Sequence, residues 1–307
     1  LVQKAAGVDF IPANDFSFYD NTLDTAVLFN IVPERYSALG VSPLDTYFAM
    51  ARGYQGEEGD VKALAMKKWF NTNYHYMVPE IEDDTRIRLS ATQPFDLFAE
   101  ALRAGVKTRP AVVGAFTFLK LARFTGTKTA ADFAPAVVAA YRDLIDVLQN
   151  AGAEWIQFDE PSLVTDLTVS DIAFFRSIYT EILAGKKIKV LLQTYFGDVR
   201  DCYTEICALP FDAIGLDFVE GKRNLSLVKT YGFSAGKTLI AGVVNGKNVW
   251  RNDFAKTVAT VRELRSVCAD VALGTSCSLL HVPYTVAAET RLSEEYKKRF
   301  AFAEEKL

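Results

Sequence analysis

Short apolar runs recur along the chain and alternate with longer stretches in which apolar residues repeat every three or four positions. The runs are rich in β-branched and aromatic residues and are apolar at almost every position, which is typical of parallel strands covered on both faces. Eight such runs predict strands at Val8–Pro12, Tyr74–Val78, Ala111–Thr117, Trp155–Phe158, Lys189–Tyr195, Ala213–Val219, Thr238–Val244 and Val271–Thr275.

The stretches between the runs have the period of amphipathic helices. Over Ala130–Gln149, the residues on one predicted helical face are Phe133, Val137, Tyr141, Leu144, Ile145 and Leu148. Thr129 and Asp132 are spaced as a capping pair, and Gly152 follows the last turn. Similar helices are predicted at Val169–Ala184 and Asp253–Val267.

Strand and helix alternate about eight times without a Gly/Ser linker, which predicts an α/β fold of the (β/α)8 TIM-barrel type. We expect one barrel domain over residues 1–307. A doubly wound open sheet is the competing arrangement, but no Gly-x-Gly-x-x-Gly follows any strand. About sixty residues separate the first two runs, too many for one crossover, so we expect added helices over one face.

Composition narrows the function classes. The chain has 307 residues, of which 50% are hydrophobic, and a net charge of -4 without a basic run, so we expect no nucleic-acid partner. No apolar stretch is long enough to span a membrane, and the first residues lack a secretory core, so we expect a cytoplasmic protein. The four cysteines form no Cys-x-x-Cys pair and are expected to be reduced. Because the chain starts without Met, we expect it to be a trimmed piece of a longer protein.

Polar residues gather where the predicted strands end. In a barrel, the carboxyl ends of the strands and the loops after them carry the chemistry. The candidate residues of this barrel mouth are Asn14, Asp15, His75, Glu80, Asp159, Glu160, Tyr195, Asp217 and Asn245. Together they predict a polar, acidic basin that suits a small polar molecule.

Each candidate also has a purely structural explanation. Asp159 and Glu160 precede a proline and are suited to starting a helix. His75 lies between two tyrosines, as core histidines often do, and Tyr195 suits ordinary packing. The residues Asn14, Asp15 and Asn245 are common turn formers.

Acids at the mouth could serve two enzymatic chemistries, glycoside hydrolysis or zinc catalysis. A glycosidase needs two acids about 5 to 9 Å apart, and the adjacent Asp159 and Glu160 alternate direction, so either would need Glu80 or Asp217 as its partner. A catalytic zinc needs about three protein ligands. Only Cys277 lies at a strand end, with His281 four residues later, so no zinc site is expected in this chain.

Seven motifs, in order along the chain, carry a resemblance to a known family. They are "DFIPANDFSFYD" (9–20), "WFNTNYHYMVPE" (69–80), "WIQFDEPSLVTDL" (155–167), "QTYFGDV" (193–199), "GLDFVEG" (215–221), "AGVVNGKNVWRNDF" (241–254) and "TSCSLLHVP" (275–283). The chain thereby resembles the N-terminal half of cobalamin-independent methionine synthase over essentially its whole length.

The resemblance implies a function for a longer protein. The family transfers a methyl group from 5-methyltetrahydrofolate polyglutamate to homocysteine, and a zinc ion in a second, C-terminal barrel holds the homocysteine thiolate. That barrel is absent from these 307 residues. We therefore expect this chain to scaffold the C-terminal barrel of the same protein and to help bind the folate tail, and to be inactive alone.

The resemblance also suggests why metal ligands are missing. Cys277 looks like a degenerate counterpart of a zinc ligand of the catalytic barrel, and Asp217 falls near the position of its glutamate ligand. The strand that should supply His-x-Cys reads Gln193-Thr194-Tyr195-Phe196 instead. No metal ligand and no catalytic residue is therefore expected here.

Arg88 is the one folate-binding residue that the resemblance implies. It matches a basic residue after the "HYMVPE" motif that contacts the glutamate tail, where lysine is more usual. A guanidinium can bind a carboxylate through two parallel hydrogen bonds. A second contact segment of the family, "RIG..RELK", would lie upstream of Leu1, as would a further strand, so the barrel is expected to lack its first strand or to be open on one side.

"IQFDEP" is similar to the "IQIDEP" of the catalytic half, where the acid receives the amino group of homocysteine. In this half the pair is expected to persist as a helix start, an interdomain contact or a relic. Two alternatives stay open: a self-sufficient barrel enzyme, either a hydrolase or a decarboxylase of the uroporphyrinogen type, that uses the mouth carboxylates, and an interaction module with an inert mouth.

Overall fold

Two compact units divide the chain in the computed structural model, which describes residues 1–307. The N-terminal unit comprises Pro12–Glu160 and Ala173–Lys189, and the C-terminal unit comprises Leu1–Ile11, Pro161–Ile172 and Val190–Leu307. The single domain expected over residues 1–307 stays a prediction.

Three parallel strands form the main sheet of the N-terminal unit, in the order β1 (Pro12–Ala13), β7 (Arg109–Val113) and β9 (Trp155–Asp159). Ala13 of β1 pairs with Pro110 of β7, and the remainder of β7 pairs with β9. Most of β7 and β9 is buried, as the nearly continuous apolar runs predicted.

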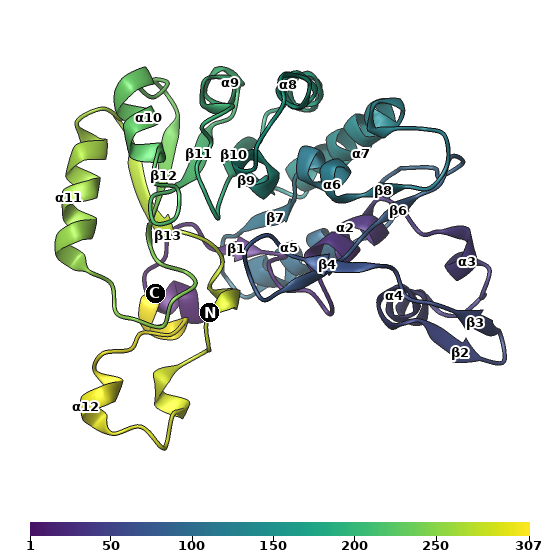
Figure 1. The fold of residues 1–307 in the computed structure, drawn as a ribbon, viewed down its shortest axis with the longest axis horizontal. Helices are drawn as coiled ribbons and strands as arrows, with labels where there is room; N and C mark the ends of the chain where they lie inside the picture. Colours follow the sequence, from purple (N-terminus) through teal and green to yellow (C-terminus); the bar gives the residue numbers. More distant parts are fainter. The chain divides into compact units, whose positions relative to one another are not determined.

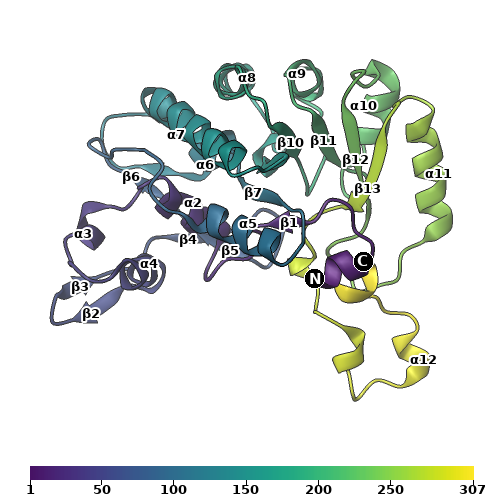
Figure 2. The same ribbon diagram turned by 180° about the vertical axis from the view of Figure 1, so that it is seen from behind.

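Helices cover this sheet and follow the predicted periods. The helices of the unit are α2 (Asn21–Leu28), α3 (Glu34–Ser37), α4 (Pro43–Arg52), α5 (Gln93–Arg103), α6 (Ala115–Leu121), α7 (Ala130–Asn150) and most of α8 (Val169–Ile182). Helices α2 and α5 contact β7, and α6 packs against α7, as Figures 1 and 2 show. The predicted capping box is confirmed, because Asp132 accepts a hydrogen bond from the backbone N–H of Thr129 at 2.8 Å.

The segment between the first two predicted strands adds helices, as expected. It contains α2, α3 and α4, and a hairpin of β2 (Tyr54–Gly56) and β3 (Gly59–Val61). These elements share an apolar core of their own, formed by Leu23, Tyr36, Leu39, Tyr47, Ala49, Met50, Ala51, Leu64 and Met77. The insertion therefore folds around its own buried cluster.

The strand predicted at Tyr74–Val78 is wrong as a barrel strand. Its central residues form β5 (His75–Met77), which pairs antiparallel with β4 (Met66–Lys68) in a separate hairpin. A short aromatic run does not distinguish a hairpin strand from a barrel strand, because both bury alternate or consecutive apolar side chains. Another two-stranded sheet pairs β6 (Glu80–Ile81) with β8 (Arg123–Phe124).

Four parallel strands form the sheet of the C-terminal unit, in the order β10 (Lys189–Gln193), β11 (Ala213–Asp217), β12 (Thr238–Val244) and β13 (Val271–Thr275). Its α-helices are α1 (Val2–Ala5), α9 (Tyr203–Ala208), α10 (Asn224–Tyr231), α11 (Phe254–Arg265) and α12 (Glu294–Lys297). Short 3-10 turns occur at Pro161–Val164, Leu279–His281, Val286–Ala288 and Glu304–Lys306. Figure 1 shows α9, α10 and α11 along one side of the strands.

The predicted α/β class is confirmed. Within each unit, neighbouring strands are parallel, follow one another in chain order and are separated by helices, which is the topology of a (β/α) barrel. Three such strands belong to one unit and four to the other. No helix has both the length and the apolar composition needed to cross a membrane.

Candidate functional site

Glu160, the second acid of the Asp-Glu-Pro motif, is fully buried at the end of β9 and caps a distant helix. Its carboxylate accepts hydrogen bonds from the backbone N–H groups of Phe116 at 2.9 Å and Thr117 at 2.7 Å, in the first turn of α6. The Tyr179 hydroxyl of α8 donates to the same carboxylate. Burial raises the pKa of Glu160 to about 7, and the hydrogen bonds from these three residues oppose that shift.

The Glu160 carboxylate packs closely against the backbone at Gly114. A Cβ atom at Gly114, the residue before α6, would overlap the Glu160 carboxylate. The motif therefore does act at a helix start, but at the start of α6, over forty residues earlier in the chain, rather than at the turn that follows it.

Asp159 faces the other way and belongs to a polar row inside the N-terminal unit. The Arg109 guanidinium donates to the Gln157 side-chain oxygen at 2.7 Å, and the Gln157 amide donates to Asp159 at 2.7 Å. Burial lowers the pKa of Arg109 to about 10, while Asp159 and Asp15 counteract this by charge attraction. The two adjacent acids thus point in opposite directions, as strand geometry predicted.

Asn14 is a turn residue, in keeping with its structural explanation. Its φ of 59° is left-handed, its side-chain amide donates to the Ala111 carbonyl at 2.8 Å, and Gln93 donates to its side-chain oxygen at 3.4 Å. Asn14 therefore joins the end of β1 to β7, and the exposed Asp15 follows it.

His75, Glu80 and Arg88 lie away from the main sheet of their unit. His75 is exposed on the β4–β5 hairpin, and Glu80 is buried in β6, where it forms an ion pair with Arg35 at 2.6 Å. Arg88 has an exposed side chain without a hydrogen-bond or ion-pair partner, and its backbone N–H donates to Phe29 at 3.2 Å.

Asp217, at the end of β11 in the C-terminal unit, accepts hydrogen bonds from backbone N–H groups of the neighbouring loops, as Glu160 does from α6. One carboxylate oxygen accepts from the backbone N–H of Val219 at 2.8 Å and Glu220 at 2.9 Å, and the other from Phe196 at 3.1 Å. Burial raises the pKa of Asp217 to about 6, while the bonds from the N–H groups oppose the shift. The hydrogen bond to Phe196 holds an aromatic residue at a left-handed φ of 74°.

The side chain of Lys247 places its ammonium group beside the Phe196 ring. The Lys247 ammonium lies 2.8 Å from Glu220 and 5.2 Å above the Phe196 ring. His281 contacts the same ring edge-on at 5.5 Å between centroids, and Tyr195 does so at 4.7 Å. The charge of Lys247 is therefore balanced by Glu220, and the Phe196 ring is packed between Lys247, His281 and Tyr195.

Asn245 forms the turn after β12 that its sequence suggested. Its side-chain oxygen accepts from the backbone N–H of Lys247 at 2.8 Å and Asn248 at 2.9 Å. The Lys306 ammonium donates to the Asn245 carbonyl oxygen, which attaches the end of the chain to this turn.

The residues around Cys277 do not fit a zinc ion. Burial raises the pKa of its thiol to about 12, and the chain contains no group of three or more His, Cys, Asp or Glu side chains placed to hold a metal. Zinc requires deprotonated thiolates and about three protein ligands. No chemical step through a metal is therefore derived for this chain.

Sequence reasoning missed several residues on which the two mouths depend. The residues absent from the candidates are Arg109, Gln157, Tyr179 and Lys247. Gln157 had a detectable signal, because it lies two residues before Asp159 and must share its face of the strand. Nothing in the local sequence indicates that Tyr179 reaches Glu160.

Comparison with known proteins agrees with the motifs. Residues 1–269 match the family described as "Cobalamin-independent synthase, N-terminal domain". A 5-methyltetrahydropteroyltriglutamate--homocysteine methyltransferase from Streptococcus suis is 55% identical over 307 residues, and one from Campylobacter jejuni subsp. doylei is 52% identical over 303 residues. These matches cover 100% and 98% of this chain and 40% of each relative.

Solved structures support the fold. A putative vitamin-B12 independent methionine synthase from Listeria monocytogenes gives a TM-score of 0.55 at 14% identity, covering 64% of this chain and 66% of that one. A B12-independent methionine synthase from Shewanella gives 0.52 at 17% identity, covering 74% and 68%. The family match over most of the chain identifies it as a member of the cobalamin-independent synthase N-terminal domain family.

Proposed function

We propose that this chain is the non-catalytic, N-terminal part of a methyltransferase that moves a methyl group from 5-methyltetrahydrofolate polyglutamate to homocysteine. Its relatives carry the name of that enzyme, and the chain spans about 40% of their length. Its role is to support a zinc-containing C-terminal barrel and to hold the folate tail.

One observation carries the non-catalytic part of this proposal. Glu160 and Asp217, which end two of the parallel strands, each accept two or three hydrogen bonds from backbone N–H groups. A carboxylate engaged in this way stabilises loops and is not available to act as a general acid or nucleophile. Glu80 is likewise committed to Arg35, so no observation favours the hydrolase alternative.

We expect purified 307-residue chain to contain far less than one zinc ion per molecule and to transfer no methyl group. Cys277 is a buried, protonated thiol with no set of partner ligands. Atomic emission spectroscopy on protein dialysed against zinc would measure the metal, and Cys277→Ser should leave the content unchanged. One tightly held zinc that disappears in Cys277→Ser would overturn the proposal.

The folate-tail role rests on unpaired surface cations of the N-terminal unit. Arg88 is exposed and has no side-chain partner. A second group of exposed cations lies on the β4–β5 hairpin, where Lys67 and Lys68 occupy β4 and Lys68 pairs in register with His75. Glutamate carboxylates bind best to guanidinium and ammonium groups, so both surfaces suit a polyglutamate tail.

Arg88→Ala is expected to weaken binding of 5-methyltetrahydrofolate triglutamate about tenfold, because one charge-assisted hydrogen-bond pair is lost. Titration calorimetry on the 307-residue chain would measure this, with Arg103→Ala, an exposed arginine of α5, as the matched control. A Lys67→Ala, Lys68→Ala double variant tests the hairpin separately. If neither change weakens binding more than Arg103→Ala does, the tail-binding role is wrong.

A further inference from the structure

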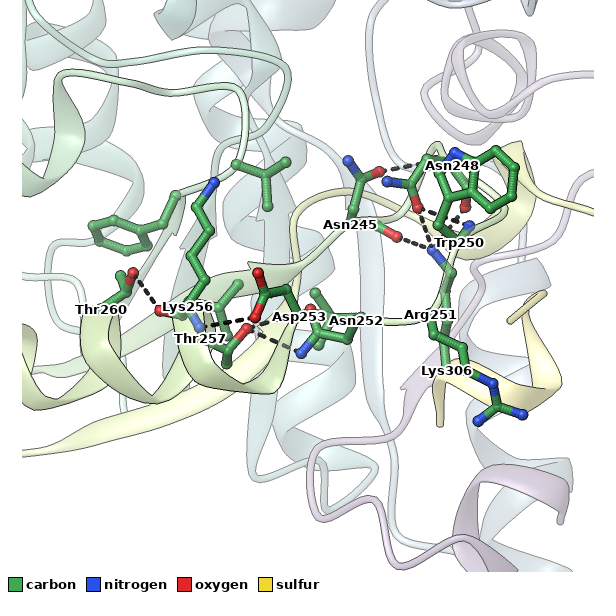
Figure 3. Close-up of a pocket in the computed structure, with 14 residues that line it drawn as sticks. Asn245, Asn248, Trp250, Arg251, Asn252, Asp253, Lys256, Thr257, Thr260 and Lys306 are labelled. Atoms are coloured by element: carbon green, nitrogen blue, oxygen red, sulfur yellow. Dashed lines mark hydrogen bonds between the residues drawn. The ribbon is translucent and has the colours of Figure 1, made fainter. Parts of the chain in front are cut away.

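A cavity of about 190 Å³ lies in the C-terminal unit, and of the candidate mouth residues only Asn245 lines it. It is bounded by the end of β12, the loop over residues 245–253 and the first two turns of α11, as Figure 3 shows. This volume exceeds the space of one or two water molecules and suits a small organic ligand.

Positively charged side chains outnumber negatively charged ones in the lining of the cavity. Three are cations, Arg251, Lys256 and Lys306, and only Asp253 is an acid. None of the three cations forms an ion pair, whereas Asp253 caps α11 by accepting the backbone N–H of Lys256 at 3.1 Å. The cavity therefore has an excess of positive charge that no carboxylate of the unit neutralises.

Lys306 contributes a charge that is fixed in place. Its half-buried ammonium donates to the carbonyl oxygens of Asn245 and Asn248, the latter at 2.7 Å, and to the Asn248 side-chain oxygen at 3.1 Å. All three acceptors are neutral, so they satisfy the N–H groups without cancelling the charge. Burial lowers the pKa of Lys306, as expected for a cation without a counter-ion.

Two donors facing the cavity have no acceptor in the chain. The Asn245 side-chain oxygen is held by the backbone N–H groups of Lys247 and Asn248, which fixes the amide and leaves its nitrogen unbonded. The Lys256 ammonium has no hydrogen-bond partner. Figure 3 shows the Lys256 side chain rising from α11 toward the space that the Asn245 amide nitrogen borders.

We propose that this cavity binds a small organic anion through a carboxylate or phosphate group. The anion would accept hydrogen bonds from the Lys256 ammonium and the Asn245 amide, within the field of Lys306. The lining residues Val219, Val243 and Trp250 offer apolar surface to a short carbon chain attached to that group. This site is separate from Arg88 and the β4–β5 hairpin, and it does not depend on the folate-tail role.

The test uses glutarate and inorganic phosphate as probes, titrated into the 307-residue chain at low ionic strength. We expect one saturable site for each probe, no binding of the neutral isostere glutaramide, and weaker binding as salt is raised. Titration with triglutamate distinguishes a free carboxylate ligand from a glutamate chain. Because Arg88 is also expected to bind triglutamate, only the binding that Lys256→Gln weakens is compared. An affinity no higher than that of glutarate assigns the site to a free anion, and a higher affinity assigns it to a glutamate chain.

Lys256→Gln is expected to weaken glutarate binding about tenfold, because a charge-assisted hydrogen bond is lost. Arg262→Gln is the matched control, since it removes the same charge from an exposed position on the same helix. It should leave the affinity within about twofold if binding is local rather than a response to net charge. Absence of saturable binding, or equal weakening by both variants, would overturn the proposal.

Discussion

Replacing Glu160 by alanine is expected to lower the free energy of unfolding by about 3 to 5 kcal/mol. The change leaves two backbone N–H groups of α6 and the Tyr179 hydroxyl without an acceptor in a fully buried site, and it opens a cavity between α6 and α8. Urea denaturation at pH 5.5, followed by circular dichroism, would measure the loss.

The matched control for this change is Glu154→Ala. Glu154 lies just before β9, is exposed, and forms a surface ion pair with Lys107 at 2.7 Å. Solvent screens an exposed pair, so this variant should lose far less stability than Glu160→Ala does. A Glu160→Ala protein no less stable than Glu154→Ala would show that the buried carboxylate does not support α6.

Glu160→Gln tests how the ionisation of the buried Glu160 carboxyl group affects the stability of the fold. Burial raises the Glu160 pKa from 4.5 to about 7, so the folded protein binds this proton more tightly than the unfolded chain does. The contribution of Glu160 to stability is therefore greatest below pH 4.5 and decreases as the pH rises to 7, by about 3 kcal/mol. Glutamine resembles the protonated acid at every pH and has no such dependence.

We expect the difference in free energy of unfolding between wild type and Glu160→Gln to change steadily in favour of Glu160→Gln as the pH rises. Burial also raises the pKa values of Asp20 and Asp217 to about 6, so wild-type stability decreases over this range for several reasons. These groups are present in both proteins, and the difference isolates Glu160. Relative to wild type, Glu160→Gln should become more stable by about 3 kcal/mol between pH 5 and 8. A constant difference would contradict the assignment.

The strands that proved easiest to predict are the apolar ones of the C-terminal unit, of which β11 is buried throughout, while Leu273 of β13 is 58% exposed. The apolar runs at Ala213–Val219, Thr238–Val244 and Val271–Thr275 match β11, β12 and β13 to within two residues. A parallel strand covered on both sides needs apolar residues throughout, and this requirement is visible in the local sequence. The run at Val8–Pro12 matches β1 only at Pro12. Two further predictions failed where the same apolar composition serves another structure.

The first of these failures is the β5 hairpin, and the second is the end of the run at Ala111–Thr117. The structure ends β7 at Val113 and begins α6 at Ala115, because Gly114 turns the chain and Glu160 accepts the first free N–H groups of the helix. The residue that determines this boundary is more than forty positions away. Local periodicity cannot reveal such a partner.

The candidate site residues were also only partly predictable from the sequence. The sequence correctly indicated that acids end the strands, since parallel strands place their carboxyl ends at one edge. It could not indicate whether those acids face solvent or backbone donors. For Glu160 and Asp217 the answer is backbone donors: Glu160 holds α6, and Asp217 holds the loops after β10 and β11. Asp159 instead accepts from the Gln157 side chain. These two acids, Glu160 and Asp217, therefore stabilise the structure, in line with the supporting role proposed above.

Gly221 closes the loop that Asp217 organises, and it shows how tightly that loop is packed. A Cβ atom at Gly221 would overlap the carbonyl oxygen of Asp217 and the side-chain nitrogen of Asn224. Asn224 is fully buried, and this nitrogen donates to the Asp217 carbonyl oxygen at 2.7 Å while its side-chain oxygen accepts from Val199 at 3.2 Å. The obstructing atoms are therefore backbone or are held by hydrogen bonds.

Gly221→Ala is consequently expected to lower the free energy of unfolding by about 3 kcal/mol or more, at the upper end of overpacking effects, because no flexible side chain can move aside. Gly274→Ala in β13 is the control, since its Cβ atom would meet only a side-chain methyl of Ile240 at 3.3 Å. That methyl can shift, so the loss should stay near 1 kcal/mol. Urea denaturation of both variants would measure the contrast. Equal stability of the two would mean that the Asp217 loop can open without cost, and the structural role assigned to its carboxylate would then be wrong.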